Sequence, residues 1–287
     1  MDISVFNAFP ISTLRRARPY APPPTFPAAR LVMTTPDPTP DRVTYVGHAT
    51  VLTELDGVRL LTDPVLRGRL GHLRRQTAPP ATGVAEALDA VLVSHLHHDH
   101  ADIPSLRRLQ RDVPVLAPPG AGAFFERRGF SAVSELAPGD SEQIGAVTVS
   151  ATEAVHPRRS RLERDSEAIG FLLSGSRRIY FAGDTDLFDG MRELDRNLDL
   201  ALLPIWGWGP SLGLGHLDPE RAAQAAAMLS PRLAIPIHWG TLYPLGLARF
   251  RPDPLRSPPR EFAAWMEKLA PQTEVRVLAP GKATSLA

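Results

Sequence analysis

The sequence predicts a mixed α/β domain, in which helices cover mixed β-sheets, preceded by a proline-rich arm. Short apolar runs typical of strands occur in both halves of the chain, with helical stretches interspersed among them. We find no internal repeat with a period of about 20 to 50 residues, and no second linker interrupts the body. We therefore expect one domain over residues 42–287 and an extended or disordered arm over residues 1–41.

The composition is that of a globular protein and does not favour a nucleic-acid-binding role. Hydrophobic residues make up 43% of the 287 residues, and the net charge is +1, so bulk electrostatics does not favour nucleic acid. The chain has no cysteine, which excludes disulfides and thiolate zinc sites. We see neither a long apolar span nor the order of segments of a signal peptide, and we expect a cytoplasmic protein.

The arm is rich in proline, which fixes φ and removes backbone donors, so no regular element is expected there. Met33 is an alternative start site within it. We hypothesise transient membrane-surface contact through the arm's aromatic residues, Phe6, Phe9, Tyr20 and Phe26.

The body begins with short β runs over residues 43–65, in which Asp56-Gly57 forms a hairpin turn between strands 50–55 and 58–62. Residues 89–95 form a continuous apolar run, typical of a strand buried on both faces. Helices are expected at 103–111, 120–129, 218–230 and 258–270, the third capped by Asp218 with Pro219 at its first position. Further strands are expected at 113–118, 145–156, 167–175, 177–186, 198–206, 232–240 and 273–278.

Side chains that bind metals follow several of these strands directly. The stretch "VSHLHHDHAD" (93–102) places four histidines and two aspartates at the end of one apolar run. His156, Asp184 and His238 each follow another run. In open sheets ligands bind where strands end, because loops there are held rigidly and face solvent.

The spacing within the cluster indicates two ions. At a turn from strand to loop, His95 and His97 can point to one side, whereas Asp99 and His100 turn toward a second ion. Imidazole and carboxylate ligands suit zinc, iron or manganese and not calcium. His98 is expected to point away, and His72 has no ligand-type residues around it in the sequence.

The series "HLHHDH" (95–100), His156, "FAGDTD" around Asp184 and "PIHWGT" around His238 resembles the metallo-β-lactamase superfamily over roughly residues 43–280. "VGHATVLTELDGVRLLTDPV" (46–65) and "GHLDPERA" (215–222) are similar to the N-acyl-phosphatidylethanolamine-hydrolysing phospholipase D branch, which borders the ascorbate-6-phosphate lactonases. The resemblance implies an αββα four-layer sandwich, with two mixed β-sheets flanked by helices and a binuclear metal centre at one edge.

The same resemblance implies a ligand set and a reaction. One metal would be held by His95, His97 and His156, the other by Asp99, His100 and His238, with Asp184 bridging. Two ions about 3.5–4 Å apart can share a water and lower its pKa. We expect a metal-dependent hydrolase containing two divalent ions (Zn, with Mn or Fe as alternatives) that cleaves a phosphodiester in a small or lipid-like substrate, with Asp99, Asp184 and His216 as catalytic candidates. Lactone, ester or amide hydrolysis and a non-catalytic metal-binding module are the alternatives.

Several further residues have two interpretations each. Asp63 would orient a ligating imidazole through its free N–H, or serve as an Asp-Pro turn residue. His48 lies near the site or is a buried structural histidine, and His216 would contact a substrate phosphate or leaving group.

The segments next to the site are also ambiguous. The relatives usually have a tryptophan directly after His156, and this chain has "PRRSRLERD" instead. Arg158, with Arg159 and Arg161, would bind an anionic group or form a solvated loop. Trp206 and Trp208, on a glycine-rich loop, would form an apolar wall or lid, or one of them would pack in the core.

Overall fold

A computed structural model describes residues 40–286, except 158–166 and 195–196, and residues Asp37–Ala287 belong to one compact unit. Residues 1–39 of the predicted arm, including Met33 and the aromatic residues, lie outside the described residues, as do Arg158, Arg159 and Arg161. None of the described helices has both the length and the apolar character needed to cross a membrane.

The first large sheet combines antiparallel strands from the start of the domain with parallel strands that follow. Its order is β17 (Lys282–Ser285), β1 (Arg42–Gly47), β2 (Thr50–Leu55), β3 (Val58–Thr62), β6 (Ala90–Leu92), β7 (Val115–Ala117) and β8 (Val133–Glu135). The predicted hairpin is present: Leu55 pairs with Val58, and Asp56 and Gly57 both have positive φ, +50° and +78°, as a type I′ turn requires.

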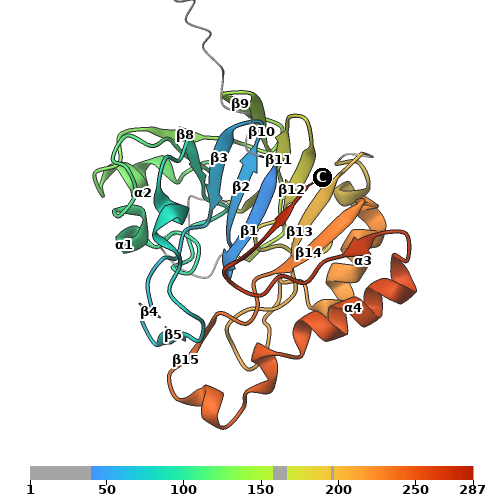
Figure 1. Ribbon diagram of the computed structural model, residues 1–287. Coiled ribbons are helices and arrows are strands. Elements are labelled where there is room, and N and C mark those ends of the chain that lie inside the picture. Colours follow the sequence, from blue (N-terminus) through green and yellow to red (C-terminus); the bar gives the residue numbers. More distant parts are fainter. Residues whose placement is uncertain (1–39, 158–166, 195–196, 287) are drawn as a thin grey trace, which may run out of the picture. The chain divides into compact units, whose positions relative to one another are not determined.

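The second large sheet is also mixed, with its parallel part formed by the later strands. Its order is β16 (Glu274–Val275), β14 (Leu233–Ile237), β13 (Leu200–Pro204), β12 (Arg178–Phe181), β11 (Ile169–Ser174), β10 (Val147–Glu153) and β9 (Ser141–Ile144). A small third sheet of β15 (Leu242–Pro244), β5 (Leu73–Arg75) and β4 (Arg69–Leu70) lies beside them (Figure 1).

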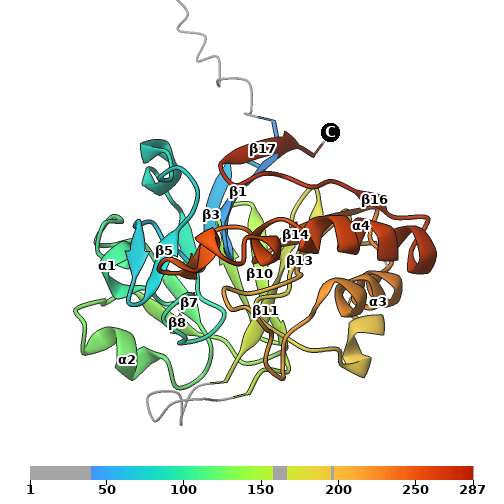
Figure 2. The ribbon, with the colours of Figure 1, turned by 90° about the horizontal axis from the view of Figure 1, so that it is seen from below.

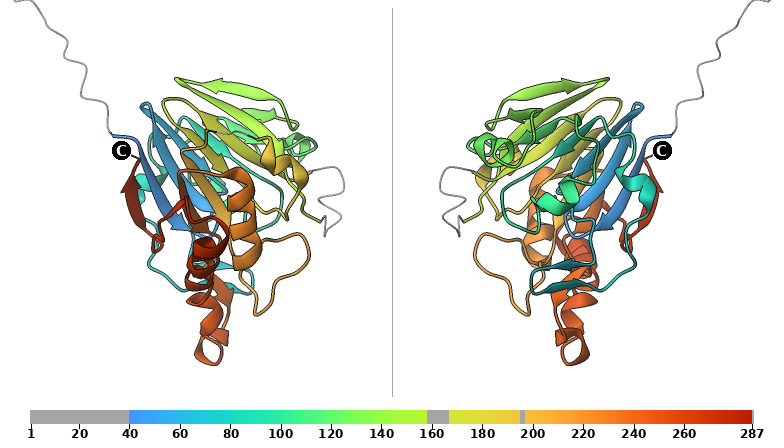
Figure 3. Two further views of the ribbon diagram at one scale, coloured as in Figure 1. Left: turned by 90° about the vertical axis from the view of Figure 1, so that its right-hand side faces the viewer. Right: turned by 90° about the vertical axis from the view of Figure 1, so that its left-hand side faces the viewer.

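Helices cover the outer faces of both large sheets. In Figure 2, α1 (Ile103–Leu106) and α2 (Gly122–Glu126) lie on one side, and α3 (Pro219–Leu229) and α4 (Pro258–Leu269) lie on the other. Figure 3 shows the two sheets stacked between them. Short 3₁₀ turns complete the described elements at Thr82–Ala85, Asp189–Arg192, Leu247–Arg249 and Asp253–Leu255. The predicted αββα sandwich is confirmed.

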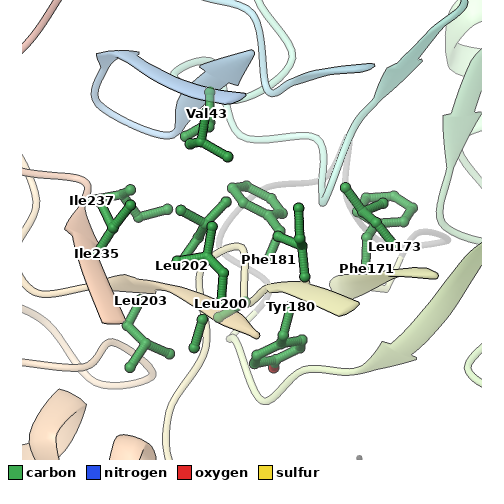
Figure 4. Close-up of a cluster of buried hydrophobic side chains, with 14 of the residues drawn as sticks. Val43, Phe171, Leu173, Tyr180, Phe181, Leu200, Leu202, Leu203, Ile235 and Ile237 are labelled. Atoms are coloured by element: carbon green, nitrogen blue, oxygen red, sulfur yellow. The ribbon is translucent and has the colours of Figure 1, made fainter. Parts of the chain in front are cut away.

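The largest core fills the space between the two sheets and continues under α3 and α4. Figure 4 shows how strand alternation builds it: Leu202 and Phe181 point toward Val43 on β1, while Tyr180 and Leu203 point to the other side of their sheet. A second core, with Phe124 and others, lies around β6 and β7 and includes residues of α1 and α2. These two cores hold the strand ends in place.

Two predicted helices are shorter than expected, and some strands differ. The stretches 103–111 and 120–129 form helices only over Ile103–Leu106 and Gly122–Glu126. The expected closing strand at 273–278 is reduced to Glu274–Val275, and β17 closes the other sheet by pairing with β1 instead. Its sequence, "KATS", lacks an apolar period, so only the backbone of β1 makes it a strand.

Candidate metal centre

Six strand ends meet at one edge of the sandwich and carry the histidines and aspartates found there. Leu92 at the end of β6 leads into residues 95–100, and β10, β12 and β14 end shortly before His156, Asp184 and His238. His48 and Asp63 directly follow the ends of β1 and β3. Because β3 and β6 are parallel, and β12 and β14 belong to one parallel set, their carboxyl ends fall on the same edge of each sheet. All seven predicted ligands are thereby brought together.

The backbone turns sharply where three of these strands end. His48, Asp63 and His238 have φ values of +60°, +36° and +62°, and they are three of the six non-glycine residues with positive φ in the described part of the chain. Such conformations are unfavourable for residues with a β-carbon and persist only where the surrounding structure holds them. The main-chain N–H of His238 donates to the carbonyl of His48 at 2.7 Å, which links two of these turns.

The first ligand group consists of His95, His97 and His156. Nε2 of His95 lies 2.7 Å from Nδ1 of His97, and Nε2 of His156 lies 3.0 Å from the same atom. His95 is buried, and the other two are partly exposed. Three imidazole nitrogens converging at this distance form a donor set suited to a transition-metal ion or zinc.

The second group consists of Asp99, His100 and His238. Nε2 of His100 lies 3.1 Å from Nε2 of His238, and these two atoms are 3.7 Å and 3.9 Å from Oδ2 of Asp99. Both histidines are buried. This group therefore offers two nitrogens and one carboxylate oxygen within the range of a single ion.

Asp184 lies between the two groups. One carboxylate oxygen, Oδ2, is 3.2 Å from Nε2 of His100, and the other, Oδ1, is 3.2 Å from Nε2 of His238. Its ligand atom also lies within 4.8 Å of those of His95 and His156, which belong to the first group. A carboxylate in this position can serve both ion sites, as the sequence predicted for a bridging residue.

In three of the histidines, the ring nitrogen that faces away from the centre lies within hydrogen-bond distance of an acceptor. This arrangement is typical of histidines that bind a metal ion through their other nitrogen. Nδ1 of His100 lies 2.7 Å from Oδ2 of Asp63, Nδ1 of His156 lies 2.7 Å from the carbonyl of Gly215, and Nδ1 of His238 lies 2.6 Å from the carbonyl of Trp206. Because each acceptor requires Nδ1 to carry a proton, the Nε2 lone pair is directed to the centre. The residues present fit a pair of metal ions.

Asp63 is fully buried and contacts both the imidazole ring of His100 and the start of the loop at Ser94. In addition to His100, it accepts hydrogen bonds from the main-chain N–H and the hydroxyl of Ser94, each at 2.7 Å. The sequence left open a ligand-orienting role or a turn role for Asp63. The structure shows both the contact to His100 and a turn conformation at this residue.

Burial determines the protonation of several ring nitrogens. Burial lowers the pKa of His156 to about 4 and that of His238 to about 3, and it also holds the pKa of His95 well below its usual value. These imidazoles are therefore neutral at neutral pH, the form that binds metal.

Neighbouring opposite charges determine the direction of the pKa shifts of His100 and Asp184. Burial alone would lower the pKa of His100, but the nearby carboxylates of Asp184, Asp63 and Asp99 raise it well above its usual value. Burial alone would raise the pKa of Asp184, but the surrounding histidines, His238 first, hold it well below the usual range. The carboxylates here require positive charge beside them, which divalent cations supply.

His48 and His216 both lie at the centre. Nε2 of His48 is 2.8 Å from Oδ2 of Asp99, and its buried ring lies against that of His238, with centroids 3.8 Å apart and an interplanar angle of 36°. His48 belongs to a possible ligand group with Asp99, His100 and His238. Nε2 of His216 lies 3.6 Å from Oδ2 of Asp184, while its Nδ1 lies 3.1 Å from the carbonyl of Leu214. His216 also belongs to a possible ligand group with His156 and Asp184.

A cavity of about 620 Å³ opens beside the centre. His97, Asp99, Asp184, His216 and His238 line one part of it, and the rest is lined largely by apolar side chains, among them Leu70, Ile103, Phe124, Trp208 and Leu212. The cavity gives a substrate access to the metal-binding residues while its apolar portion is removed from water.

The two tryptophans of the glycine-rich loop have different surroundings. Trp208 lines the cavity, with His72 against its ring at a centroid distance of 5.2 Å. Trp206 packs against the main core, and its indole N–H donates to the carbonyl of Gly209 at 3.1 Å. One tryptophan thus forms the expected apolar wall, and the other is a core residue.

Comparison with known proteins agrees with this geometry. A family model described as a beta-lactamase superfamily domain matches residues 58–239, a range that includes all seven predicted ligands. The chain belongs to the beta-lactamase superfamily. It is 32% identical over 252 residues to a UPF0173 metal-dependent hydrolase of Rubrobacter xylanophilus, and this match covers 84% of this chain and 95% of that protein.

Two further proteins are similar to this chain. An N-acyl-phosphatidylethanolamine-hydrolyzing phospholipase D 1 of Caenorhabditis elegans is 31% identical over 238 residues, which cover 74% of this chain and 67% of that protein. The structure of a metallo hydrolase from Ignicoccus hospitalis matches with a TM-score of 0.66 and 25% identity, covering 86% of this chain and 98% of that one. The chain spans 64% of the length of the Mycobacterium proteins that it matches.

The sequence analysis did not identify much of the wall of the cavity beside the metal centre. His72 was set aside, yet it lines the cavity with its neighbours Leu70 and Leu73. Arg67 and Arg128 line the cavity too. Arg67, Leu70, His72 and Leu73 lie within residues 67–73, and Arg128 comes from a distant segment. No motif joins the two segments, so no pattern in the sequence could assign them to one cavity. His98 is exposed, lines the cavity and belongs to none of the ligand groups among the described residues.

Proposed function

We propose that the chain is a hydrolase that uses two divalent metal ions to cleave a phosphodiester in a small or lipid-like substrate. The observation that carries this proposal is the position of Asp184 between two sets of three ligands. A single structural ion would need only one of these sets, and a buried arrangement of this size next to an open cavity favours catalysis.

Each of the two ligand groups would bind one ion. His95, His97 and His156 would hold one ion, Asp99, His100 and His238 would hold the other, and Asp184 would contact both. Zinc, manganese and iron all suit these donors. When bound, two such ions supply Lewis acidity, which makes water more acidic and offsets charge that develops on the oxygens of the substrate.

Side chains of the centre would accept protons, contact the substrate and orient the metal ligands. Asp99 and Asp184 are the carboxylates placed to accept a proton from the attacking water, and Asp99 is held by its hydrogen bond with His48. His216 lies at the cavity and beside Asp184, so it is placed to contact a phosphate oxygen or the leaving group. Asp63 positions His100 from behind, which keeps Nε2 of His100 directed to the centre.

Two observations favour a phosphodiester over a lactone or amide. A relative that covers 74% of this chain bears the name of a phospholipase D, an enzyme class that cleaves phosphodiesters. The apolar part of the cavity also suits a substrate with a lipid-like or aromatic substituent.

A substrate pair tests the reaction type. Protein loaded with zinc or manganese is assayed with bis(4-nitrophenyl) phosphate and with a simple aliphatic lactone, and Asp184→Asn serves as the inactive control. We expect turnover of the diester, lost in the variant. Turnover of the lactone alone would replace the diesterase proposal with a lactonase. Two bound metals without turnover of either substrate would support a metal-binding module instead.

A further inference from the structure

One wall of the cavity combines apolar and cationic side chains. This wall is formed by the segment near β4 and by α1 and α2, and its members include Leu70, Ile103, Phe124, Arg67 and Arg128. No step of the proposed hydrolysis uses either arginine. Whether each arginine is already paired with a carboxylate therefore indicates whether it is available to bind a ligand in the cavity.

Arg67 is already neutralised by a carboxylate. Its Nε and Nη2 donate to the two oxygens of Asp102, each at 2.8 Å, in the bidentate arrangement that is strongest for an arginine and a carboxylate. Asp102 is buried and also caps α1, so this pair is part of the scaffold.

Arg128 differs from Arg67 in having no carboxylate partner among the described residues. Its guanidinium lies over the ring of Phe124, 3.7 Å from the centroid, and Nη1 donates to the carbonyl of Phe124 at 2.8 Å. These two contacts hold the group in one orientation and use one of its five N–H donors. A partly buried guanidinium with donors left over, at the wall of an apolar cavity, suits an anionic oxygen group.

We propose that Arg128 binds a second anionic group of the substrate, such as a carboxylate or a phosphate monoester, at a distance from the bond that is cleaved. This inference rests on the proposed hydrolase function, and it narrows the substrate class to amphiphiles. The cleaved group lies at the metal centre, an apolar segment lies along Phe124 and Trp208, and the anionic end meets Arg128.

Binding of inert ligands tests this without reference to turnover. The probes are alkyl hydroxamates whose far end is a carboxylate, compared with the same compounds ending in a carboxamide, over a series of chain lengths. The hydroxamate binds the metal ions in both members of a pair, so only the far end differs. Kd is measured by calorimetry on the zinc-loaded protein, on Arg128→Met and on Arg128→Lys.

The matched control is Arg127→Met, because Arg127 neighbours Arg128 in the chain and is exposed outside the cavity. At the best chain length we expect the carboxylate to bind about tenfold more tightly than the carboxamide in the wild type and in Arg127→Met, as suits one charge-assisted contact. This preference should vanish in Arg128→Met and return in part in Arg128→Lys, which keeps the charge.

The outcomes separate this inference from the proposed function. No preference at any chain length, or a preference that survives in Arg128→Met, would overturn the role of Arg128 even if the diester is hydrolysed. A preference that depends on Arg128 would uphold it even if the reaction proves to be lactone hydrolysis. Failure of the wild-type protein to bind either probe would overturn the role of Arg128, whereas turnover of the diester decides the proposed function separately.

Discussion

Asp63 and His100 form a hydrogen bond in which Nδ1 of His100 lies 2.7 Å from Oδ2 of Asp63, and both side chains are completely buried. The two residues are 37 positions apart and come from the ends of neighbouring parallel strands, β3 and β6. The contact determines which nitrogen of His100 faces the centre, so a residue outside the ligand set controls a ligand.

Replacing Asp63 should weaken metal binding. In Asp63→Asn the negative charge that supports the His100 ring is lost, and we expect the affinity of one of the two metal sites to fall about 10- to 100-fold. Titration against a chelator of known affinity measures the change. Asp112→Asn, on an exposed residue, serves as the control; equal affinities in the two variants would contradict the assignment.

Metal content should depend on Asp184 and His97 and not on His98. We expect about two metal ions per chain in the wild type, close to one in His97→Ala, and less than one in Asp184→Ala, because Asp184 serves both groups. Elemental analysis after dialysis gives the ratio. His98→Ala, which removes an exposed neighbouring imidazole, should keep both ions. Unchanged content in both His97→Ala and Asp184→Ala would exclude the binuclear centre.

The metal-free protein should lose stability in acid partly through His156. Its folded pKa is lowered to about 4, mainly by burial, whereas the unfolded chain binds a proton near pH 6.5. A group with a depressed folded pKa contributes stability above its unfolded pKa, and this contribution declines as the pH falls from about 6.5 to 4.

His156→Gln tests this contribution. Over that interval we expect the free energy of unfolding of the metal-stripped variant to fall less steeply than that of the wild type, by up to roughly 1.4 kcal/mol per pH unit. Urea unfolding at a series of pH values gives both curves. Parallel curves would show that His156 titrates normally in the folded protein.

Substitution of Trp208 should weaken substrate binding, whereas substitution of Trp206 should lower stability. Trp208→Ala removes apolar surface from the cavity, and we expect KM for a diester with an aryl group to rise about tenfold, equivalent to about 1.4 kcal/mol, with little change in Tm. Trp206→Ala removes a side chain packed on the core and should lower the free energy of unfolding by roughly 2–3 kcal/mol. A higher KM in Trp206→Ala with no loss of stability would reverse the assignment.

Most of the fold and the ligand set were predictable because their signals are local. Apolar runs marked the buried strands, Asp56-Gly57 marked a turn, and Asp218 with Pro219 marked the start of α3, where Asp218 accepts from the N–H of Arg221 at 2.8 Å. The short strands of the small sheet left no such signal, because Leu242 pairs with Arg75 across a large sequence separation.

The sequence by itself predicted most of the longer strands, the superfamily and seven residues with metal-binding chemistry, because an apolar strand followed by a ligand-type residue is a local pattern. Only the tertiary structure decided which nitrogen of each ring faces the centre and that Trp206 belongs to the core and Trp208 to the cavity. It also decided that Arg67 pairs with Asp102, whereas Arg128 has no carboxylate partner within the part of the chain that the structure describes. These outcomes depend on hydrogen bonds and packing between segments that are distant in sequence, and burial, which makes those contacts strong, exists only in the folded chain.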